Sequence, residues 1–217
     1  MDINQIYNMD CFEGMKLMKD KSINSVVTSP PYNRKRNDKY KDYNDDIEDY
    51  FAFLCNFTDE CLRLSKDYVF VNIQKNFYNK KDVFNYIGHY SDKIVEIIIW
   101  EKSNPMPASG FNITNAYEFF ICLADKPLKS NKTYTKNTLM TPVNSQTTLK
   151  NHRAVMRTDV CEWFVTMFTK EEDVILDPFM GSGTTAVACK LHNRNYVGFE
   201  ISQEYHQISI ERIQDLN

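Results

Sequence analysis

Short apolar runs alternate along the chain with longer segments in which apolar residues recur at every third or fourth position. The short runs are rich in β-branched and aromatic residues and predict buried strands, whereas the wider spacing predicts amphipathic helices. The predicted strands are Ile3–Tyr7, Ile23–Thr28, Tyr68–Ile73, Lys93–Trp100, Glu118–Leu123, Val174–Asp177 and Tyr196–Glu200. The predicted helices are Phe12–Lys19, Ile47–Leu64, Phe77–Gly88, Val160–Phe168, Thr184–Leu191 and Gln203–Ile213. This rhythm is typical of a mostly parallel, doubly wound α/β sheet with helices on both faces.

One connection departs from this rhythm. The strands Lys93–Trp100 and Glu118–Leu123 follow each other through SNPMPASGFNITN, a linker without helical periodicity. Parallel neighbours need a long crossover, usually a helix, so these two strands are predicted to pair antiparallel. The sequence therefore predicts a seven-stranded, mostly parallel sheet with one antiparallel strand at its edge.

Two polar stretches interrupt the pattern. Residues 33–46, NRKRNDKYKDYNDD, are predicted to form a mobile surface loop, and residues 125–151, rich in Lys, Asn and Thr, a small insertion. Only these stretches concentrate enough basic and polar side chains to suggest contact with a phosphate backbone. A solvated, charged surface is the alternative for both. The candidate DNA-contacting residues are Arg34, Lys35, Arg36, Lys39, Tyr40, Lys129, Lys132 and Lys136.

Length and composition fit one folded domain. The chain has 217 residues, about one and a half typical domain lengths, so we expect a single domain over residues 1–217. Hydrophobic residues make up 42% and charged residues 25%, with a mean hydropathy of −0.50, the balance of a water-soluble protein. No apolar run approaches the roughly 18 residues that span a bilayer, and the amino terminus lacks signal-peptide features, so we expect a cytoplasmic protein without a membrane partner. Because the net charge is −3, contact with nucleic acid would have to come from a local basic surface.

Cysteine and histidine residues are scattered and show no metal-ligand spacing. No two cysteines form a C-x-x-C pair, and most lie in apolar stretches, so they are predicted to be small buried hydrophobes. We therefore expect no metal site.

The segment VILDPFMGSGTT carries the strongest local signal for chemistry. A predicted strand ends in Asp177, and Gly181 and Gly183 then let the backbone turn tightly at the carboxyl end of a strand, where open α/β sheets bind cofactors. A later strand ends in Glu200, whose carboxylate can accept hydrogen bonds from both hydroxyls of a ribose. The turn contains no lysine, so the predicted cofactor is nucleotide-like with little negative charge. A glycine-containing turn before a helix can also be purely structural.

A second signal is the segment VVTSPPYN, in which a predicted strand runs directly into Ser29, Pro30, Pro31 and Tyr32. The prolines fix the backbone and cannot continue a sheet, so they hold Tyr32 where the strand emerges. A hydroxyl, a proline carbonyl and a tyrosine ring can bind an exocyclic amino group and stack on the heterocycle that bears it. An ordinary strand-ending turn is the structural alternative.

Together the two segments resemble the motifs of amino-methylating DNA methyltransferases that use S-adenosylmethionine, in the permuted order with the catalytic motif first. The family's catalytic [DNS]-P-P-[YFW] motif matches Ser29–Tyr32, and its cofactor motif D-P-F-x-G-S-G-T-T matches Asp177–Thr185. The segment IIIWEKSNPMP resembles the family's W-x-K-x-N-x-x-P stretch. The resemblance covers nearly the whole chain and implies a Rossmann-like methyltransferase fold. The cofactor-binding residues that it implies are Asp10, Cys11, Asp177, Pro178, Phe179, Gly181, Gly183, Thr184, Thr185 and Glu200.

The family's chemistry implies a target base flipped out of the duplex, with its amino nitrogen facing the sulfonium methyl. Tyr32 would stack on this base, while the Ser29 hydroxyl and the Pro30 carbonyl would hold its amino group for in-line displacement. Many adenine-N6 enzymes of this kind carry aspartate where this chain has Ser29, and serine is commoner in cytosine-N4 enzymes. The following Asn33, however, gives PPYN, which is associated more with adenine enzymes. The sequence therefore favours adenine N6 and keeps cytosine N4 as the alternative.

The implied partner is double-stranded DNA, and the implied host is prokaryotic or a phage. In this family the sequence-reading part usually lies where this chain has residues 125–151, a stretch too small to read a long site. We therefore expect short or relaxed recognition, help from residues 33–46, or a homodimer that supplies further DNA contacts. An RNA or protein-amide substrate, a catalytically silent DNA-binding partner subunit, and a nicotinamide-dependent oxidoreductase are the remaining alternatives.

Overall fold

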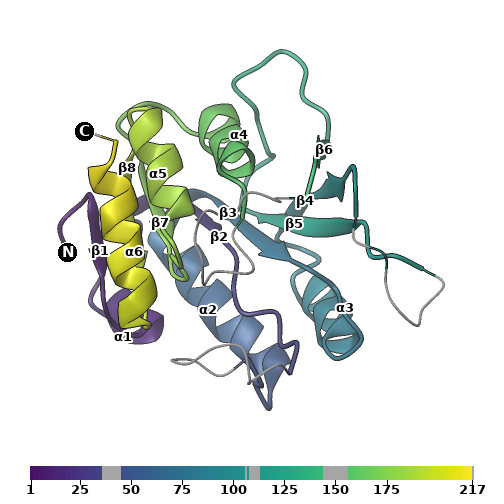
Figure 1. The fold of residues 1–217 in the computed structure, drawn as a ribbon. Helices are drawn as coiled ribbons and strands as arrows, with labels where there is room; N and C mark the ends of the chain where they lie inside the picture. The colour runs from purple at the N-terminus through teal and green to yellow at the C-terminus, as the bar shows by residue number, and fades with distance from the viewer. Residues whose placement is uncertain (36–44, 106, 108–112, 144–155, 217) are drawn as a thin grey trace.

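The structure is a computed structural model that describes residues 1–35, 45–105, 107, 113–143 and 156–216. Its strands form one mixed sheet flanked by helices (Figure 1), which confirms the predicted α/β class. The strands are β1 (Gln5–Tyr7), β2 (Ile23–Thr28), β3 (Ser65–Ile73), β4 (Ile94–Lys102), β5 (Tyr117–Leu123), β6 (Thr138–Thr141), β7 (Val174–Asp177) and β8 (Asn195–Phe199). The helices are α1 (Cys11–Lys16), α2 (Tyr50–Leu64), α3 (Lys80–His89), α4 (Thr158–Phe168), α5 (Thr184–Leu191) and α6 (Gln203–Gln214).

The sequence predicts the antiparallel strand at the edge of the sheet, and this prediction is wrong, because that strand, β5, lies between β3 and β4. The described strands number eight, in the order β1-β8-β7-β2-β3-β5-β4-β6, and every neighbouring pair is parallel except β3 with β5 and β5 with β4. After β4, the chain turns back and β5 enters the gap beside β3. There Phe120, Ile121 and Cys122 are fully buried. The interior position removes more of this apolar strand from water than an exposed edge would.

The edge strand next to β4 is β6, which the sequence pattern did not predict. It lies within the stretch predicted as an insertion and pairs parallel to β4, with Thr138 opposite Ile99 and Thr141 opposite Lys102. The Trp100 indole N–H of β4 donates to the Thr141 hydroxyl at 2.8 Å. Four residues with a mixed burial pattern carry no periodic signal, so pairing with β4, and not local sequence, determines this strand.

Each face of the sheet is covered by its own helices, as predicted. On one face, α2 buries Leu54, Phe57 and Cys61, which recur at three- and four-residue spacing and pack with α1 and α3. On the other face, Phe164 of α4 and Ile213 of α6 join the core around α5. Figure 1 shows α4, α5 and α6, in green and yellow, apart from α2 and α3, in blue.

The two sequence motifs meet where the sheet's connections diverge. From β2 the chain passes through α2 to β3, and from β7 it passes through α5 to β8, so the two connections leave in opposite directions. Open α/β sheets bind ligands outside the carboxyl ends of the strands at such a switch point. Ser29 follows β2 and Pro178 follows β7, so the fold brings both motifs to this point.

Among the helices that the structure describes, none combines the length and the apolar composition that spanning a bilayer requires. Over the described residues, no group of three or more His, Cys, Asp and Glu side chains could hold a metal ion. The six cysteines are free thiols, and five of them are buried, with Cys55 partly exposed.

Gly14 and Gly88 provide a matched pair of packing tests. A Cβ at Gly14 would overlap the fully buried ring of Phe199, whereas one at Gly88 meets nothing within 4 Å. Alanine is favoured over glycine in a helix by about 1 kcal/mol, but overpacking a core costs about 1–3 kcal/mol. We expect Gly14→Ala to lower the free energy of unfolding in urea by about 1 kcal/mol, and Gly88→Ala to preserve or raise it. Equal values for the two variants would contradict this packing.

Candidate active site

The segment that leaves the carboxyl end of β2 forms a polar network with β3 and β5. Ser29 Oγ lies 2.8 Å from Tyr32 Oη and donates to Asn72 Oδ1 at 3.3 Å. The Tyr32 hydroxyl donates to Asn72 Oδ1 at 2.5 Å and to Glu118 Oε2 at 3.1 Å. Side chains from two neighbouring strands therefore fix both the Ser29 hydroxyl and the Tyr32 ring.

The backbone of this segment is held from its other side. The Pro31 carbonyl accepts a hydrogen bond from the Tyr50 hydroxyl of α2 at 2.7 Å. The Tyr32 carbonyl accepts from the side-chain amides of Asn76 and Asn79, each at 2.8 Å. Prolines cannot join a strand ladder, so these side-chain contacts replace sheet bonds in holding the strand end.

Glu118 and Lys102 form a buried ion pair beside Tyr32. Lys102 Nζ lies 3.2 Å from Glu118 Oε1, and the two side chains are only 12% and 9% exposed. Gln74 donates a further hydrogen bond to the same carboxylate at 3.3 Å. Burial lowers the pKa of Lys102 to about 8, although Glu118 opposes this shift. Burial, together with the Glu118 charge, raises the pKa of Tyr32 well above its ordinary value, so the phenol keeps its proton and acts as a donor.

Asp177, at the end of β7, connects the two motifs. Its Oδ1 accepts from the Thr28 hydroxyl at 2.6 Å and from the Phe179 backbone N–H at 3.1 Å, and its Oδ2 accepts from the Thr185 hydroxyl at 2.7 Å. Burial raises the pKa of this carboxyl, while the three hydrogen bonds oppose the rise. Thr28 immediately precedes Ser29, so one carboxylate joins the end of β2 to the glycine turn.

The glycine turn needs backbone conformations that other residues rarely adopt. Gly181 and Gly183 have φ values of 55° and 83°, in the left-handed region. The Gly181 N–H donates to Glu200 Oε2 at 2.7 Å, and the Ser202 N–H donates to Glu200 Oε1 at 2.8 Å. A carboxylate offers about four acceptor positions, so Glu200 keeps about two for a ligand. Burial raises the pKa of Glu200, while its two backbone hydrogen bonds oppose the rise.

The other predicted cofactor residues lie along the same edge of the sheet. Asp10 accepts hydrogen bonds from two backbone N–H groups of α1, at 2.9 and 3.2 Å, and caps that helix. Cys11 is buried, and burial raises its thiol pKa to about 12, so the side chain packs as an apolar group. The Phe179 ring packs against two phenylalanine rings of α2, at centroid distances of 5.8 and 5.4 Å. Pro178 and Thr184 are buried at the two ends of the turn.

Part of the predicted DNA-contacting group also lies at this edge. Arg34 donates to Gln74 and lies over the Tyr32 ring, 5.2 Å from its centroid. Lys35 forms an ion pair with Asp46 at 3.4 Å. The predicted residues that fall outside the described ranges are Arg36, Lys39 and Tyr40.

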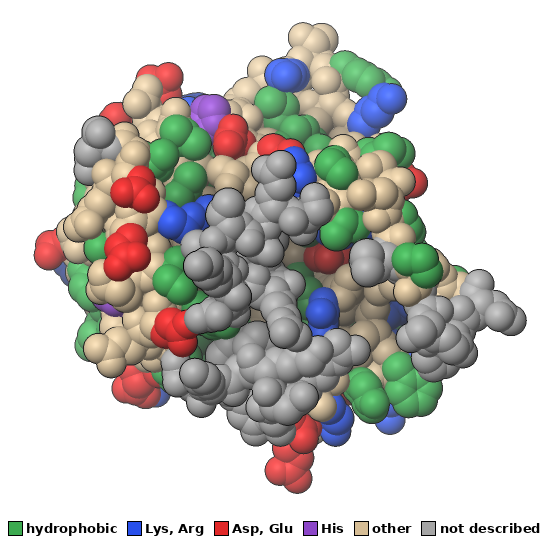
Figure 2. Space-filling view, in the orientation of Figure 1, with side chains coloured by type: hydrophobic (Ala, Val, Ile, Leu, Met, Phe, Trp, Pro, Cys, Tyr) green, Lys and Arg blue, Asp and Glu red, His purple; other side chains and the backbone are tan. Residues whose placement is uncertain are grey.

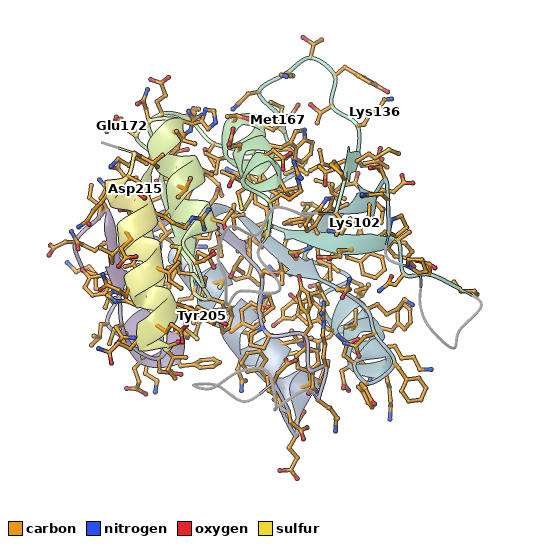
Figure 3. The ribbon with its side chains drawn as sticks, in the orientation of Figure 1. Lys102, Lys136, Met167, Glu172, Tyr205 and Asp215 are labelled. Atoms are coloured by element: carbon orange, nitrogen blue, oxygen red, sulfur yellow. The ribbon has the colours of Figure 1, made fainter. Side chains whose placement is uncertain are left out.

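The remaining predicted contacts are Lys129, Lys132 and Lys136. They lie toward the amino ends of the parallel strands, whereas Ser29 follows a carboxyl end. Because β5 runs antiparallel, the segment that follows it starts beside the amino end of β3. There the Lys129 backbone N–H donates to the Tyr68 hydroxyl at 3.2 Å. Figure 3 shows Lys136 on the same side as Met167, near the end of α4, and opposite Tyr205, near the start of α6. Their contact with DNA stays a prediction, but the structure separates them from Ser29.

Sequence reasoning missed several polar residues that hold the site together. Asn72 and Glu118 each interrupt an apolar strand, VFVNI and YEFFICL, and this interruption is the signal that could have found them. Arg212 of α6 donates to the Ser182 carbonyl of the glycine turn at 2.6 Å. An arginine on an amphipathic helix carries no comparable signal. Thr28 also escaped attention, because a threonine in a strand is ordinary.

The chain is similar to known proteins in both sequence and fold. Residues 23–211 match the DNA methylase family (N6_N4_Mtase). Type II methyltransferase M.HinfI of Haemophilus influenzae is 25% identical over an alignment of 254 positions that covers 99% of this chain and 69% of that protein. Two solved structures share the fold at lower identity. PvuII DNA methyltransferase, described as cytosine-N4-specific, has a TM-score of 0.81 at 20% identity and covers 98% of this chain and 86% of its own. M1.HpyAVI in complex with SAM has a TM-score of 0.68 at 23% identity and covers 96% of this chain and 98% of its own.

The buried ion pair makes a prediction about proton binding. Competitive acetylation of lysines, followed by mass spectrometry across a pH series, should show Lys102 titrating near 8. Glu118→Gln should lower that value further, because it removes the charge that favours the ammonium form. Glu101→Gln, at the exposed neighbouring position, is the control and should leave it unchanged. A Lys102 that titrates like an ordinary lysine would show that the pair is not buried.

Proposed function

The chain belongs to the DNA methylase family, and we propose that it transfers a methyl group from S-adenosylmethionine to adenine N6 in double-stranded DNA. The observation that carries this proposal is the hydrogen bond from Thr28 to Asp177, which joins the ends of β2 and β7. The segment after β2 suits a planar ring with an amino group, and the turn after β7 suits an adenosine-type cofactor. Their direct connection supports a reaction between the two bound groups, since positioning is the main requirement of methyl transfer. A bacterial cytoplasm is the proposed location, because the relative M.HinfI comes from Haemophilus influenzae.

The residues at the turn fit such a cofactor. Gly181 and Gly183 have no side chains, which permits close approach of a ligand to the backbone. Glu200 keeps about two acceptor positions, which match the two hydroxyls of a ribose. The turn itself has no basic side chain, and S-adenosylmethionine needs none because it carries no phosphate. When bound, the cofactor supplies a methyl group activated by a positive sulfonium.

Ser29, Pro30 and Tyr32 act on the target base. The Tyr32 ring offers a stacking face, and its hydroxyl is tied to Asn72 and Glu118, so the ring keeps one orientation. The Ser29 hydroxyl and the Pro30 carbonyl hold the amino group, so that its nitrogen lone pair points at the methyl carbon. In-line transfer forms the bond from the amino nitrogen to the methyl carbon as the bond from that carbon to sulfur breaks, and the electron pair stays on sulfur. A serine hydroxyl is a weaker acceptor than a carboxylate, so the amino proton then leaves to solvent.

Cytosine N4 is the second candidate for the target. It is favoured by Ser29, which stands where many adenine enzymes carry aspartate, and by the fold of the cytosine-N4-specific PvuII enzyme. Adenine is favoured by the PPYN sequence. The Asn33 side chain donates to the Ile47 carbonyl at 3.1 Å and accepts from the Ile47 N–H at 3.0 Å. These two hydrogen bonds fix the backbone next to Tyr32.

Nucleoside analysis of plasmid DNA tests the reaction and the target together. The chain is expressed in a methylation-deficient host, and the recovered plasmid is digested and analysed by mass spectrometry. We expect N6-methyladenine above the level in a host with the empty vector. N4-methylcytosine alone would replace the adenine proposal with the cytosine one, and the absence of both modifications would refute the proposed activity.

Three variants separate the base side from the cofactor side. Ser29→Ala and Tyr32→Ala should each abolish plasmid methylation while calorimetric binding of S-adenosylmethionine survives. Asp177→Ala should abolish cofactor binding as well, because it removes the acceptor of three hydrogen bonds that shape the turn. Full methylation by the Tyr32→Ala variant would contradict the assignment of this ring to the target base.

A further inference from the structure

Two large aromatic side chains project into solvent close to the proposed active site. Phe77 and Tyr78 are 71% and 56% exposed, and their rings meet edge to face with centroids 5.5 Å apart. They belong to the short loop between β3 and α3, at the carboxyl edge of the sheet. Neighbouring exposed aromatics are unusual on a surface that contacts only water, and they commonly mark a binding site.

The loop that carries this aromatic pair is fixed to the proposed base-binding residue. Asn76 and Asn79 both donate to the Tyr32 carbonyl, at 2.8 Å each, and Asn79 is fully buried. The Tyr78 backbone N–H donates to Asn76 Oδ1 at 2.8 Å, which ties the aromatic pair to the same network. The hydrogen bonds of Asn76 and Asn79 therefore hold the loop that carries Phe77 and Tyr78 against the backbone of Tyr32.

The surroundings of the pair are basic. Lys80 Nζ lies 5.0 Å from the centroid of the Phe77 ring, and Lys81 is exposed beside it, with Asp82 as the nearby acid in the first turn of α3. Figure 2 shows hydrophobic side chains next to basic ones over α3, at the lower right of the molecule. Aromatic rings interleaved with lysines suit a nucleic acid, whose bases stack on the rings and whose phosphates pair with the ammonium groups.

We propose that Phe77 and Tyr78 stack on the DNA bases that lose their neighbour when the target base leaves the duplex. This inference rests on the proposed function, because it presumes a duplex held at Tyr32. Extruding a base sacrifices its stacking on both sides, and an aromatic surface at the vacated position restores part of that stacking. Lys80 and Lys81 contact the phosphates beside the opened step.

Binding to duplexes with and without a vacated position tests the stacking directly. The probes are two fluorescein-labelled DNA duplexes of one sequence, fully paired or with a central abasic site. We expect the wild-type chain, saturated with S-adenosylmethionine, to bind the abasic duplex at least fivefold more tightly. The double variant Phe77→Ala, Tyr78→Ala should lose this preference, and Tyr134→Ala, which removes a 77% exposed aromatic at the opposite edge, should keep it. An unchanged preference in the double variant would overturn the inference.

A salt titration tests the lysines. On the paired duplex, Lys80→Ala with Lys81→Ala should reduce the slope of log affinity against log salt by about two, one for each phosphate contact. The matched pair Lys66→Ala with Lys170→Ala, both exposed at the amino edge, should leave the slope unchanged. Equal slopes for the two pairs would contradict the phosphate contacts.

Plasmid methylation separates this inference from the proposed function. If the wild-type chain methylates DNA and the aromatic variant still prefers the abasic duplex, the inference fails and the function stands. If no methylation is found but the preference depends on Phe77 and Tyr78, the stacking surface stands and the reaction fails. Because both rings are exposed, thermal unfolding and S-adenosylmethionine binding of the double variant should match the wild type.

Discussion

The hydrogen bond between Thr28 and the Asp177 carboxylate is the contact on which the rest of the site depends. It joins the ends of β2 and β7 across 149 positions of sequence, where the connections of the sheet diverge. A carboxylate can be buried only when its oxygens find donors, and Thr28, Thr185 and the Phe179 N–H provide them. Satisfying this one group therefore fixes the strand end that leads into Ser29 and the turn that leads into α5.

A second buried carboxylate, Glu118, organises the wall on the other side of Tyr32. It accepts hydrogen bonds from Tyr32 and Gln74 and pairs with Lys102. Because both charges of the pair lose water on burial, their attraction is largely offset by the cost of desolvation. The Glu118 carboxylate also accepts the hydrogen bond from the Tyr32 hydroxyl and so holds the tyrosine in place. Asn76 and Asn79 also donate to the Tyr32 carbonyl, so hydrogen bonds connect the residue proposed to hold the base with the exposed aromatic loop.

The net charge of −3 is compatible with a DNA substrate because local groups of basic residues lie near both ends of the central strands. Arg34, Lys80 and Lys81 lie toward the carboxyl edge, near Tyr32, whereas the lysines of residues 124–137 lie beside the amino end of β3 and the end of α4. At physiological salt, charges on the surface act over only about 8 Å. In the proposed function, a duplex held at Ser29 would lie nearer the first group, and the direction of β5 accounts for the separation of the two groups.

The sequence by itself determined the fold class, the two motifs and, among the described residues, each helix and each strand except β6, because periodicity and motif spacing are local properties of the chain. Only the tertiary structure decided where β5 lies and that β6 exists, since both depend on which distant strand offers a free edge. A lone polar residue in an apolar strand, such as Asn72, indicates that its side chain has a hydrogen-bond partner, but the sequence does not identify that partner. The chemical roles proposed for Ser29 and Asp177 could be inferred from their neighbours in sequence. Glu118 contacts Tyr32 only because folding pairs β5 with β3.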